Sequence, residues 1–190
     1  TGVQTCALPI CKDYIAAGMF LIPSGMFTFA LRNAGTWRFI MDETGEFVRP
    51  TRLMFPESKK GWELSWNSGK RHAVSKKIQN WVAKEEKDFA FRYAGALVVD
   101  FHRLLHNGGM FMYPAIINEA DEAKNRPDGK LRLMYEANVV AMLAHEAGGV
   151  AINEHGDEIM DFLPTDRHQR SALYVGNKEL VHSVRAALRS

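Results

Sequence analysis

The chain has 190 residues, of which 46% are hydrophobic and 24% are charged, and its formal net charge is +2. This length is enough for one domain with its own core, and the composition is typical of soluble globular proteins. The small net charge and scattered basic residues indicate no nucleic-acid partner, and no apolar run reaches the ~18 residues of a membrane span, which indicates no membrane partner.

The first eleven residues do not share the pattern of the rest of the chain. They are short for a signal peptide and lack a basic start. We interpret residues 1–11 as an artefactual leader and residues 12–190 as the domain. The only cysteines, Cys6 and Cys11, lie in this leader, so the domain has no disulfide framework and a reducing, cytoplasmic setting fits.

The first half of the domain is predicted to hold mostly strands. The apolar stretch 14–31 is interrupted by Gly and Pro, so we expect the end of a helix near Ala17 before its strand. Strands are predicted at 26–31, 37–41, 46–48 and 62–66. The turn at 42–45 joins two of them into a hairpin, and its acidic residues are interpreted as a solvated tip: Asp42, Glu43 and Glu46. A connector covers 51–61, and a helix opens at 67–69.

The second half alternates helices and strands. Helices are predicted at 92–106, 137–147 and from Asn177 to the C-terminus. Strands are predicted at 110–113, 130–133, 150–152, 159–163 and 172–175. A polar loop at 115–129 is long for a compact domain and indicates a surface insertion or a flap. This alternation predicts an α/β fold, a layered sandwich with a mixed β-sheet flanked by helices.

Two charged residues frame the short strand at 130–133. Lys130 begins it, and Glu136 lies where the strand passes into the next helix. A lysine and a carboxylate at such a junction suit a phosphate and a metal ion. On spacing alone, solvated charges beside a helix dipole are the commoner arrangement.

Five ordered segments resemble the class I fructose-1,6-bisphosphatases. The signature-like segment is Gly129–Asn138. The others, in order, are Arg92–Gly95 with Asp100–Arg103, Gly108–Pro114, Glu146–Gly149 and Pro164–Arg170. The resemblance runs from about Tyr14 to the C-terminus and corresponds to roughly the C-terminal half of the family's chain, so an N-terminal half is expected to be missing here.

The resemblance implies a sugar-phosphatase-like fold and a reaction of carbohydrate metabolism and gluconeogenesis. That reaction is the Mg²⁺-dependent hydrolysis of fructose 1,6-bisphosphate to fructose 6-phosphate and phosphate by a homo-oligomer, a dimer or tetramer. The residues that match sugar and 6-phosphate contacts are Asn67, Arg92, Tyr93, Tyr113 and Lys130. Glu136 matches a metal ligand, and Arg92 matches a residue that reaches into a neighbouring subunit. A helix beginning near Arg92 would also offer free N–H groups to an anion.

Two departures from the family pattern limit these expectations. Ser68, Gly69 and Lys70 follow Asn67, where the family has an acidic residue, Gly, and an aromatic residue or Asn. No Asp-Pro-x-Asp-Gly-Ser motif is present, so Glu136 is the only metal ligand that matches. Magnesium keeps its waters unless several anionic ligands converge. We therefore assign no catalytic residue to this chain and predict that it is inactive alone.

Alternative functions remain open at this stage. The phosphate anchors favour a bisphosphorylated sugar over an inositol phosphate, but they do not separate fructose from sedoheptulose 1,7-bisphosphate. The chain could also be a non-catalytic sugar-phosphate-binding half. Several other polar residues are interpreted as structural: Asp100, His102, Arg103, His168 and Arg170.

Overall fold

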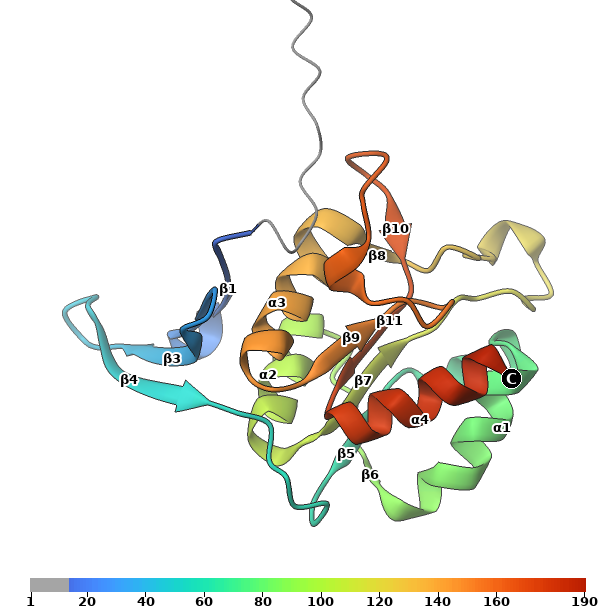
Figure 1. Ribbon diagram of the computed structural model, residues 1–190, viewed down its shortest axis with the longest axis horizontal. Helices are drawn as coiled ribbons and strands as arrows, with labels where there is room; N and C mark the ends of the chain where they lie inside the picture. Colours follow the sequence, from blue (N-terminus) through green and yellow to red (C-terminus); the bar gives the residue numbers. More distant parts are fainter. Residues whose placement is uncertain (1–13) are drawn as a thin grey trace, which may run out of the picture.

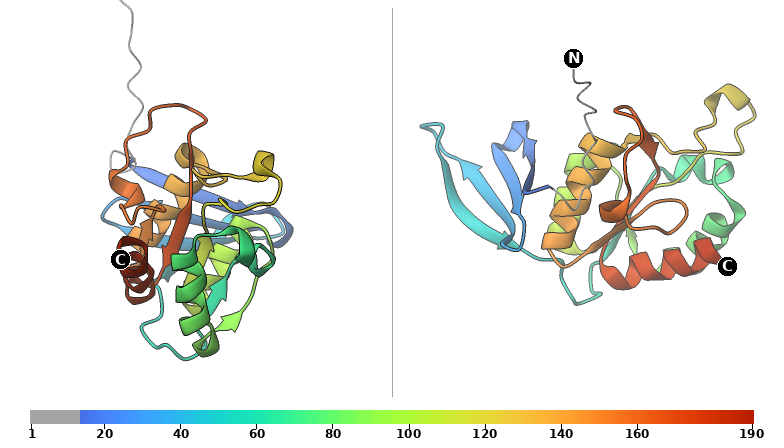
Figure 2. Two further views of the ribbon diagram at one scale, coloured as in Figure 1. Left: turned by 90° about the vertical axis from the view of Figure 1, so that its right-hand side faces the viewer. Right: turned by 45° about the horizontal axis from the view of Figure 1, so that its top comes forward.

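The computed structural model describes residues Tyr14–Ser190, so the predicted leader lies outside the described residues. The fold has four layers (Figures 1 and 2): a four-stranded sheet, helices α2 and α3, a five-stranded sheet, and helices α1 and α4. The helices are α1 (Lys76–Glu85), α2 (Leu97–Asn107), α3 (Asn138–Glu146) and α4 (Lys178–Arg189). The predicted α/β sandwich with a mixed sheet flanked by helices is confirmed. No helix in the described part of the chain is long and apolar enough to cross a membrane.

The outer sheet is an antiparallel meander. Its strands are β1 (Ala16–Leu21), β2 (Met26–Leu31), β3 (Gly35–Met41) and β4 (Phe47–Leu53). The predicted strand at 26–31 and the hairpin are confirmed. The predicted helix end near Ala17 is wrong: Ala17 and Met19 are buried while Ala16 and Phe20 are exposed, which is the two-residue period of a half-buried strand. The predicted connector begins too early, because β4 continues to Leu53.

The acidic hairpin tip organises its own turn. One carboxylate oxygen of Asp42 accepts hydrogen bonds from Thr44 N (2.9 Å), Thr44 Oγ1 (2.7 Å) and Glu46 N (3.1 Å). These bonds lower the pKa of Asp42. The interpretation of this segment as the turn of a hairpin is confirmed.

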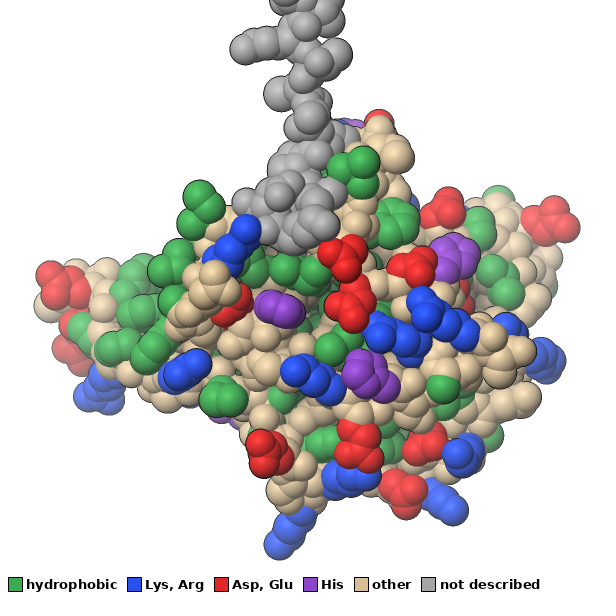
Figure 3. All heavy atoms as spheres, in the orientation of Figure 1, with side chains coloured by type: hydrophobic (Ala, Val, Ile, Leu, Met, Phe, Trp, Pro, Cys, Tyr) green, Lys and Arg blue, Asp and Glu red, His purple; other side chains and the backbone are tan. Residues whose placement is uncertain are grey.

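The face of the outer sheet that points away from α2 and α3 carries an aromatic cluster. The ring of Phe47 lies 5.8 Å from that of Phe20 and 5.5 Å from that of Phe27, centre to centre. Phe20 is 38% exposed and Phe47 48% exposed, and Figure 3 shows hydrophobic side chains gathered over this part of the molecule. Apolar patches of this kind usually mark interaction surfaces.

The five-stranded sheet is mixed. Its strands, in spatial order, are β6 (Ala90–Phe91), β5 (Glu63–Ser65), β7 (Gly109–Tyr113), β11 (Leu173–Gly176) and β9 (Val150–Ile152). β5 runs parallel to both β6 and β7, whereas β11 runs antiparallel to β7 and β9. The carboxyl ends of β6, β5 and β7 therefore meet at one edge.

Alternate residues of the mixed sheet enter two different cores. Met110 and Met112 pack on the α1 and α4 side, whereas Phe111 packs on the α2 and α3 side. Tyr174 and Val175 divide in the same way on β11. Each fully buried apolar side chain contributes about 1.5–3 kcal/mol of transfer free energy. Both faces are covered, which is why the predicted strand at 110–113 is a nearly continuous apolar run.

Two predicted helices and one predicted strand need correction. α1 begins at Lys76, where the Ser75 hydroxyl accepts the Ile78 N–H, and the predicted start at 67–69 is a 3₁₀ segment, η3 (Ser68–Ala73). α2 begins at Leu97 rather than Arg92. The predicted strand at 159–163 is a 3₁₀ turn, η7 (Ile159–Asp161).

The N-terminal cap of α4 also differs from the expectation. Asn177 holds the cap position, but its side chain makes no capping bond. It accepts the Gly109 N–H (2.7 Å) and donates to Pro56 O (2.7 Å). The amide therefore ties the start of α4 to β7 and to the preceding connector.

His102 is a buried titratable group that makes stability depend on pH. Its Nδ1 lies 3.4 Å from Thr28 Oγ1 on β2. Burial, followed by the charges of His106 and Arg38, lowers the pKa of His102 to about 4. Because the unfolded histidine titrates near pH ~6.5, the native state binds fewer protons, and stability is lost as the pH falls from about 6.5 towards 4.

We predict that His102 contributes about 2 kcal/mol to the loss of unfolding free energy between about pH 7.5 and about pH 5. Urea titrations of the wild type and of His102→Gln measure this contribution, because the glutamine does not titrate. His182→Gln, on the exposed side of α4, is the matched control and should keep the wild-type dependence. An unchanged pH dependence in His102→Gln would contradict the assignment.

Candidate functional site

Residues at or just after the carboxyl ends of three parallel strands gather at one edge of the mixed sheet. Asn67 follows β5, Tyr93 follows β6, and Tyr113 ends β7. Because β5 lies between β6 and β7 and is parallel to both, these side chains emerge at the same edge. The carboxyl ends of parallel strands are where α/β proteins usually bind ligands.

A close backbone contact fixes the register of β5 and β7. Gly109 has a φ of +111°, and a Cβ at this position would lie 1.9 Å from Glu63 O. Only glycine permits this approach. The Glu63 N–H donates to Gly108 O at 3.1 Å, and this register places Ser65, the last residue of β5, opposite Phe111 of β7.

A second, short ladder carries Lys130 to the same edge. β8 (Leu131–Arg132) pairs antiparallel with β10 (Arg170–Ser171). Nη1 of Arg170 donates to Lys130 O at 2.5 Å, and the Tyr135 hydroxyl lies 3.5 Å from His168 Nδ1. The interpretation of His168 and Arg170 as organisers of this loop agrees with these contacts.

Glu136 lies in a single π-helical turn, η6 (Leu133–Ala137), between β8 and α3. The Asn138 N–H donates to Leu133 O, which widens the turn. Oε2 of Glu136 accepts the Arg132 N–H at 2.7 Å, so the carboxylate is held over the end of β8. The predicted position of Glu136 at a strand-to-helix junction is confirmed. The π turn was not predicted, although such turns are frequent at functional sites.

These elements enclose a cavity of about 410 Å³, here called the front cavity. It is lined by all the predicted site residues except Arg92, namely Asn67, Tyr93, Tyr113, Lys130 and Glu136. Nζ of Lys130 lies 5.9 Å from the centre of the Tyr113 ring. Two further cations also line the cavity: Arg132, which the sequence analysis did not name as a site residue, and Arg170, which it interpreted as structural. Their alternation with Leu131 and Ser171 is the only sequence signal for them.

The electrostatics of the front cavity suit an anion. Three cations, Lys130, Arg132 and Arg170, face a single carboxylate, that of Glu136. Burial, then Tyr113 and Asp100, raise the pKa of Tyr93, so its hydroxyl remains protonated and can donate at neutral pH. Guanidinium, ammonium and hydroxyl donors are the groups that bind phosphate in proteins.

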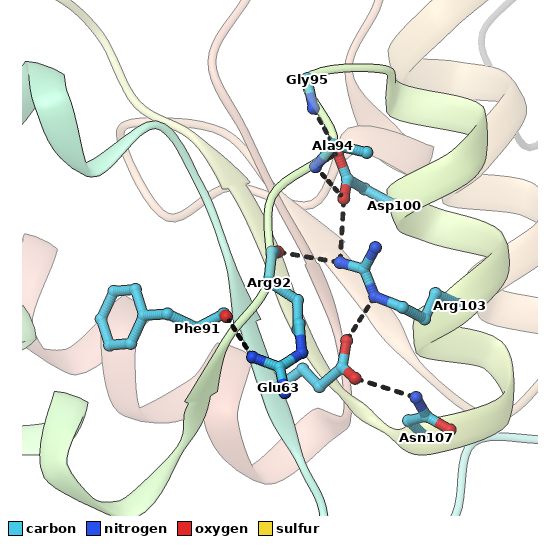
Figure 4. A network of polar contacts seen from close by, with 8 residues as sticks. All are labelled: Glu63, Phe91, Arg92, Ala94, Gly95, Asp100, Arg103 and Asn107. Carbon is cyan, nitrogen blue, oxygen red and sulfur yellow. Dashed lines mark hydrogen bonds and ion pairs between the residues drawn. The ribbon is translucent and has the colours of Figure 1, made fainter.

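Arg92 lies outside the front cavity. Its Nη1 donates to the neighbouring Phe91 O at 3.0 Å, and the side chain is exposed (Figure 4). The expected helix N-terminus at Arg92 is wrong, because α2 begins five positions later, at Leu97. Within one copy of the chain, Arg92 is therefore not part of the wall of this cavity.

The described residues do not fit a magnesium site by themselves. In the range 14–190, no group of three His, Cys, Asp or Glu side chains is placed to hold a metal ion. Among the residues that line the front cavity, Glu136 is the one carboxylate. Magnesium requires near-octahedral oxygen ligands, and Glu136 would supply one of them.

A buried ionic network holds the segment between β6 and α2 (Figure 4). The Asp100 carboxylate accepts the N–H groups of Ala94 (2.9 Å) and Gly95 (3.1 Å). Nη2 of Arg103 donates to Asp100 (2.9 Å) and to Arg92 O (2.8 Å). Nε of Arg103 also reaches the buried Glu63 of β5 at 2.5 Å. The structural interpretation of Asp100 and Arg103 is confirmed, and the network fixes the backbone on either side of Tyr93.

We predict that Asp100→Asn loosens this segment. An asparagine keeps the shape of the carboxylate but turns an N–H₂ group towards the N–H donors, which costs about 2 kcal/mol of unfolding free energy. Amide hydrogen exchange at Ala94 and Gly95 should accelerate. Asp88→Asn, in an exposed turn, is the control and should change stability by no more than about 0.5 kcal/mol. Unchanged exchange at both amides would contradict the role of Asp100.

The amino-acid sequence is similar to proteins of known family. Residues 56–189 match the family model "Fructose-1-6-bisphosphatase, C-terminal domain". The chain is 54% identical over 179 residues to the class 1 fructose-1,6-bisphosphatase of Syntrophus aciditrophicus (94% of this chain, 54% of the relative), and 39% identical to that of Synechococcus sp. strain JA-3-3Ab (91% and 50%). It therefore spans about half the length of these relatives.

A solved structure extends the comparison to the fold. The fructose-1,6-bisphosphatase of Leishmania major in holo form superposes with a TM-score of 0.83 at 29% identity, covering 94% of this chain and 53% of that one. The superposition covers most of the chain, so the comparison of folds and the family model point to the same family. The chain belongs to the fructose-1,6-bisphosphatase family, and its residues 56–189 match the family's C-terminal domain.

Proposed function

We propose that this chain is the sugar-phosphate-binding part of an enzyme that hydrolyses fructose 1,6-bisphosphate to fructose 6-phosphate and phosphate. The observation that carries the proposal is the front cavity. There, donors from three strand ends and the β8 ladder face one carboxylate on η6. This arrangement suits a ligand with two phosphates. The donors would bind one phosphate, and the other would react with the assistance of a metal ion near the carboxylate.

The proposed roles divide between the two ends of the cavity. Lys130, Tyr93 and Tyr113 bind the phosphate that is retained, with Asn67 as a further donor. Arg132 and Arg170 add positive charge beside them. Anchoring that end positions the reacting phosphate, and positioning is a large part of phosphoryl-transfer catalysis.

Glu136 is proposed to contribute one ligand to magnesium. When bound, such an ion neutralises charge on the reacting phosphate. The other carboxylates would come from chain that this sequence does not include, since its relatives are about twice as long. The exposed aromatic cluster around Phe27 supports this, because a face of that kind is suited to packing against a further part of the same protein.

A homo-oligomer is proposed on the position of Arg92. The side chain is exposed and does not line its own front cavity, so it is available to enter the cavity of a second subunit. A cytoplasmic setting is proposed because both cysteines of the chain precede residue 12.

We predict that the purified chain binds fructose 6-phosphate in calorimetric titrations and that Lys130→Met weakens binding by about ten- to a hundred-fold, the usual effect of losing a charge-assisted hydrogen bond. Tyr113→Phe should weaken it less. The control Lys87→Met changes an exposed lysine beyond α1 and should leave binding unchanged. Equal affinity of wild type and Lys130→Met would contradict the proposed anchor.

The same preparation should release no phosphate from fructose 1,6-bisphosphate in the presence of Mg²⁺. Measurable Mg²⁺-dependent release would show that the described residues complete a metal site. Titration with sedoheptulose 7-phosphate in parallel compares the two candidate sugars.

A further inference from the structure

The loop 115–129, here called the strap, joins two residues of the front cavity. It begins after Tyr113 and Pro114, at the end of β7, and it returns directly to Lys130, before β8. Tyr113 and Lys130 both line the front cavity, and Nζ of Lys130 lies 5.9 Å from the centre of the Tyr113 ring. Figure 1 shows the strap, in yellow, running out from β7 and back to β8. Its conformation therefore affects how these two residues are placed.

The strap is closed at its base and docked on a second segment. Ile116 and Arg126 exchange backbone hydrogen bonds of 3.1 and 2.7 Å across the base. Farther along the strap, the N–H groups of Ile117 and Asn118 both donate to Ala73 O, at 2.8 and 3.1 Å. Ala73 is the last residue of η3. The predicted flap is therefore docked against η3.

One carboxylate supplies the charged contact between the strap and η3. Oε1 of Glu119 accepts a hydrogen bond from Nζ of Lys70 at 2.5 Å, and Oε2 lies 3.5 Å from Nε2 of His72. The Glu119 side chain is only 10% exposed. The hydrogen bond from Lys70 lowers the pKa of Glu119, so the carboxylate is ionised at neutral pH. Across residues 14–190, no other charged side chain of the strap forms an ion pair outside the strap.

This ion pair connects the segments that carry three wall residues of the front cavity. Lys70 lies in η3, which begins directly after Asn67, and the Lys70 N–H donates to Asn67 O at 3.0 Å. Glu119 lies in the strap, between Tyr113 and Lys130. Glu119 itself does not line the front cavity, so it makes no contact with a ligand there.

We propose that the strap is a latch, which Glu119 closes on Lys70 and His72, and that Glu119 is a positioning residue for the front cavity. When the latch is closed, the two ends of the strap are held, and Lys130 is presented to the ligand together with Tyr113. When it is open, the backbone bonds to η3 lose their charged support. Lys130 then has more freedom to lose on binding, which costs affinity. This inference rests on the function proposed for the front cavity.

The sign of one substitution separates positioning from a direct effect of charge. Glu119→Gln removes a negative charge beside a site for anions, so charge alone would tighten the binding of fructose 6-phosphate. Loss of the latch predicts the opposite, a weakening of about three- to ten-fold in calorimetric titrations. The matched control is Glu122→Gln, because Glu122 lies in the same strap, is exposed and forms no ion pair across residues 14–190. The control should stay within about two-fold of the wild-type affinity.

A charge-exchanged variant tests the ion pair itself. Lys70→Glu combined with Glu119→Lys restores a pair of reversed direction and keeps the net charge of the chain. It should recover the affinity for fructose 6-phosphate to within about three-fold of the wild type, whereas each single change should lose affinity. A double variant no better than Lys70→Glu alone would contradict the role of the pair.

Amide hydrogen exchange reports on the latch without any ligand. Glu119→Gln should accelerate exchange at the Ile117 and Asn118 amides by at least about three-fold and leave the amides of β11 unchanged, which distinguishes local opening from a global loss of stability. Unchanged exchange at both strap amides, or equal or tighter binding of fructose 6-phosphate by Glu119→Gln, would overturn the proposal. A wild type that fails to bind fructose 6-phosphate would instead contradict the proposed function, and the exchange rates would still decide whether Glu119 closes the strap.

Discussion

The parallel pairing of β5 with β6 and β7 is the constraint on which the candidate site depends. The carboxyl ends of β6, β5 and β7 lie at one edge because the strands are parallel. The close contact of Gly109 with Glu63 fixes the register of β5 and β7. Any side chain at residue 109 would push β7 away from β5. Tyr113 would then move relative to Asn67, and the wall of the front cavity that both residues form would open.

Glu63, at the start of β5, is a buried carboxylate that needs a positively charged partner. An unpaired buried carboxylate is strongly destabilising. Arg103 pairs with Glu63 and, at the same time, with the fully buried Asp100. The same guanidinium bonds Arg92 O. One ionic network therefore both supports β5 and shapes the segment that carries Tyr93, which links stability of the sheet to the geometry of the site.

Sequence analysis predicted the strands, α3 and the position of Glu136 because each has a local signal. It placed the start of α2 too early because Asp100 captures the preceding N–H groups from inside the helix, an arrangement that periodicity does not reveal. It missed β1 because Gly18 interrupts a pattern of small residues. It left the loop 115–129 as a surface insertion or a flap, because the bonds that dock the loop join residues 117–118 to residues 73–74, which are distant in sequence. The site residues were named through family resemblance, whereas composition and spacing left them as solvated charges.

A crystal structure of this chain with fructose 6-phosphate would test the central claim most directly. The account predicts the phosphate group in the front cavity, within about 2.6–3.2 Å of the Tyr113 hydroxyl and Lys130 Nζ, with the sugar extending towards Glu136. Phosphate bound outside the front cavity, or an empty front cavity at saturating ligand, would contradict the claim that the strand ends and the β8 ladder form one sugar-phosphate site.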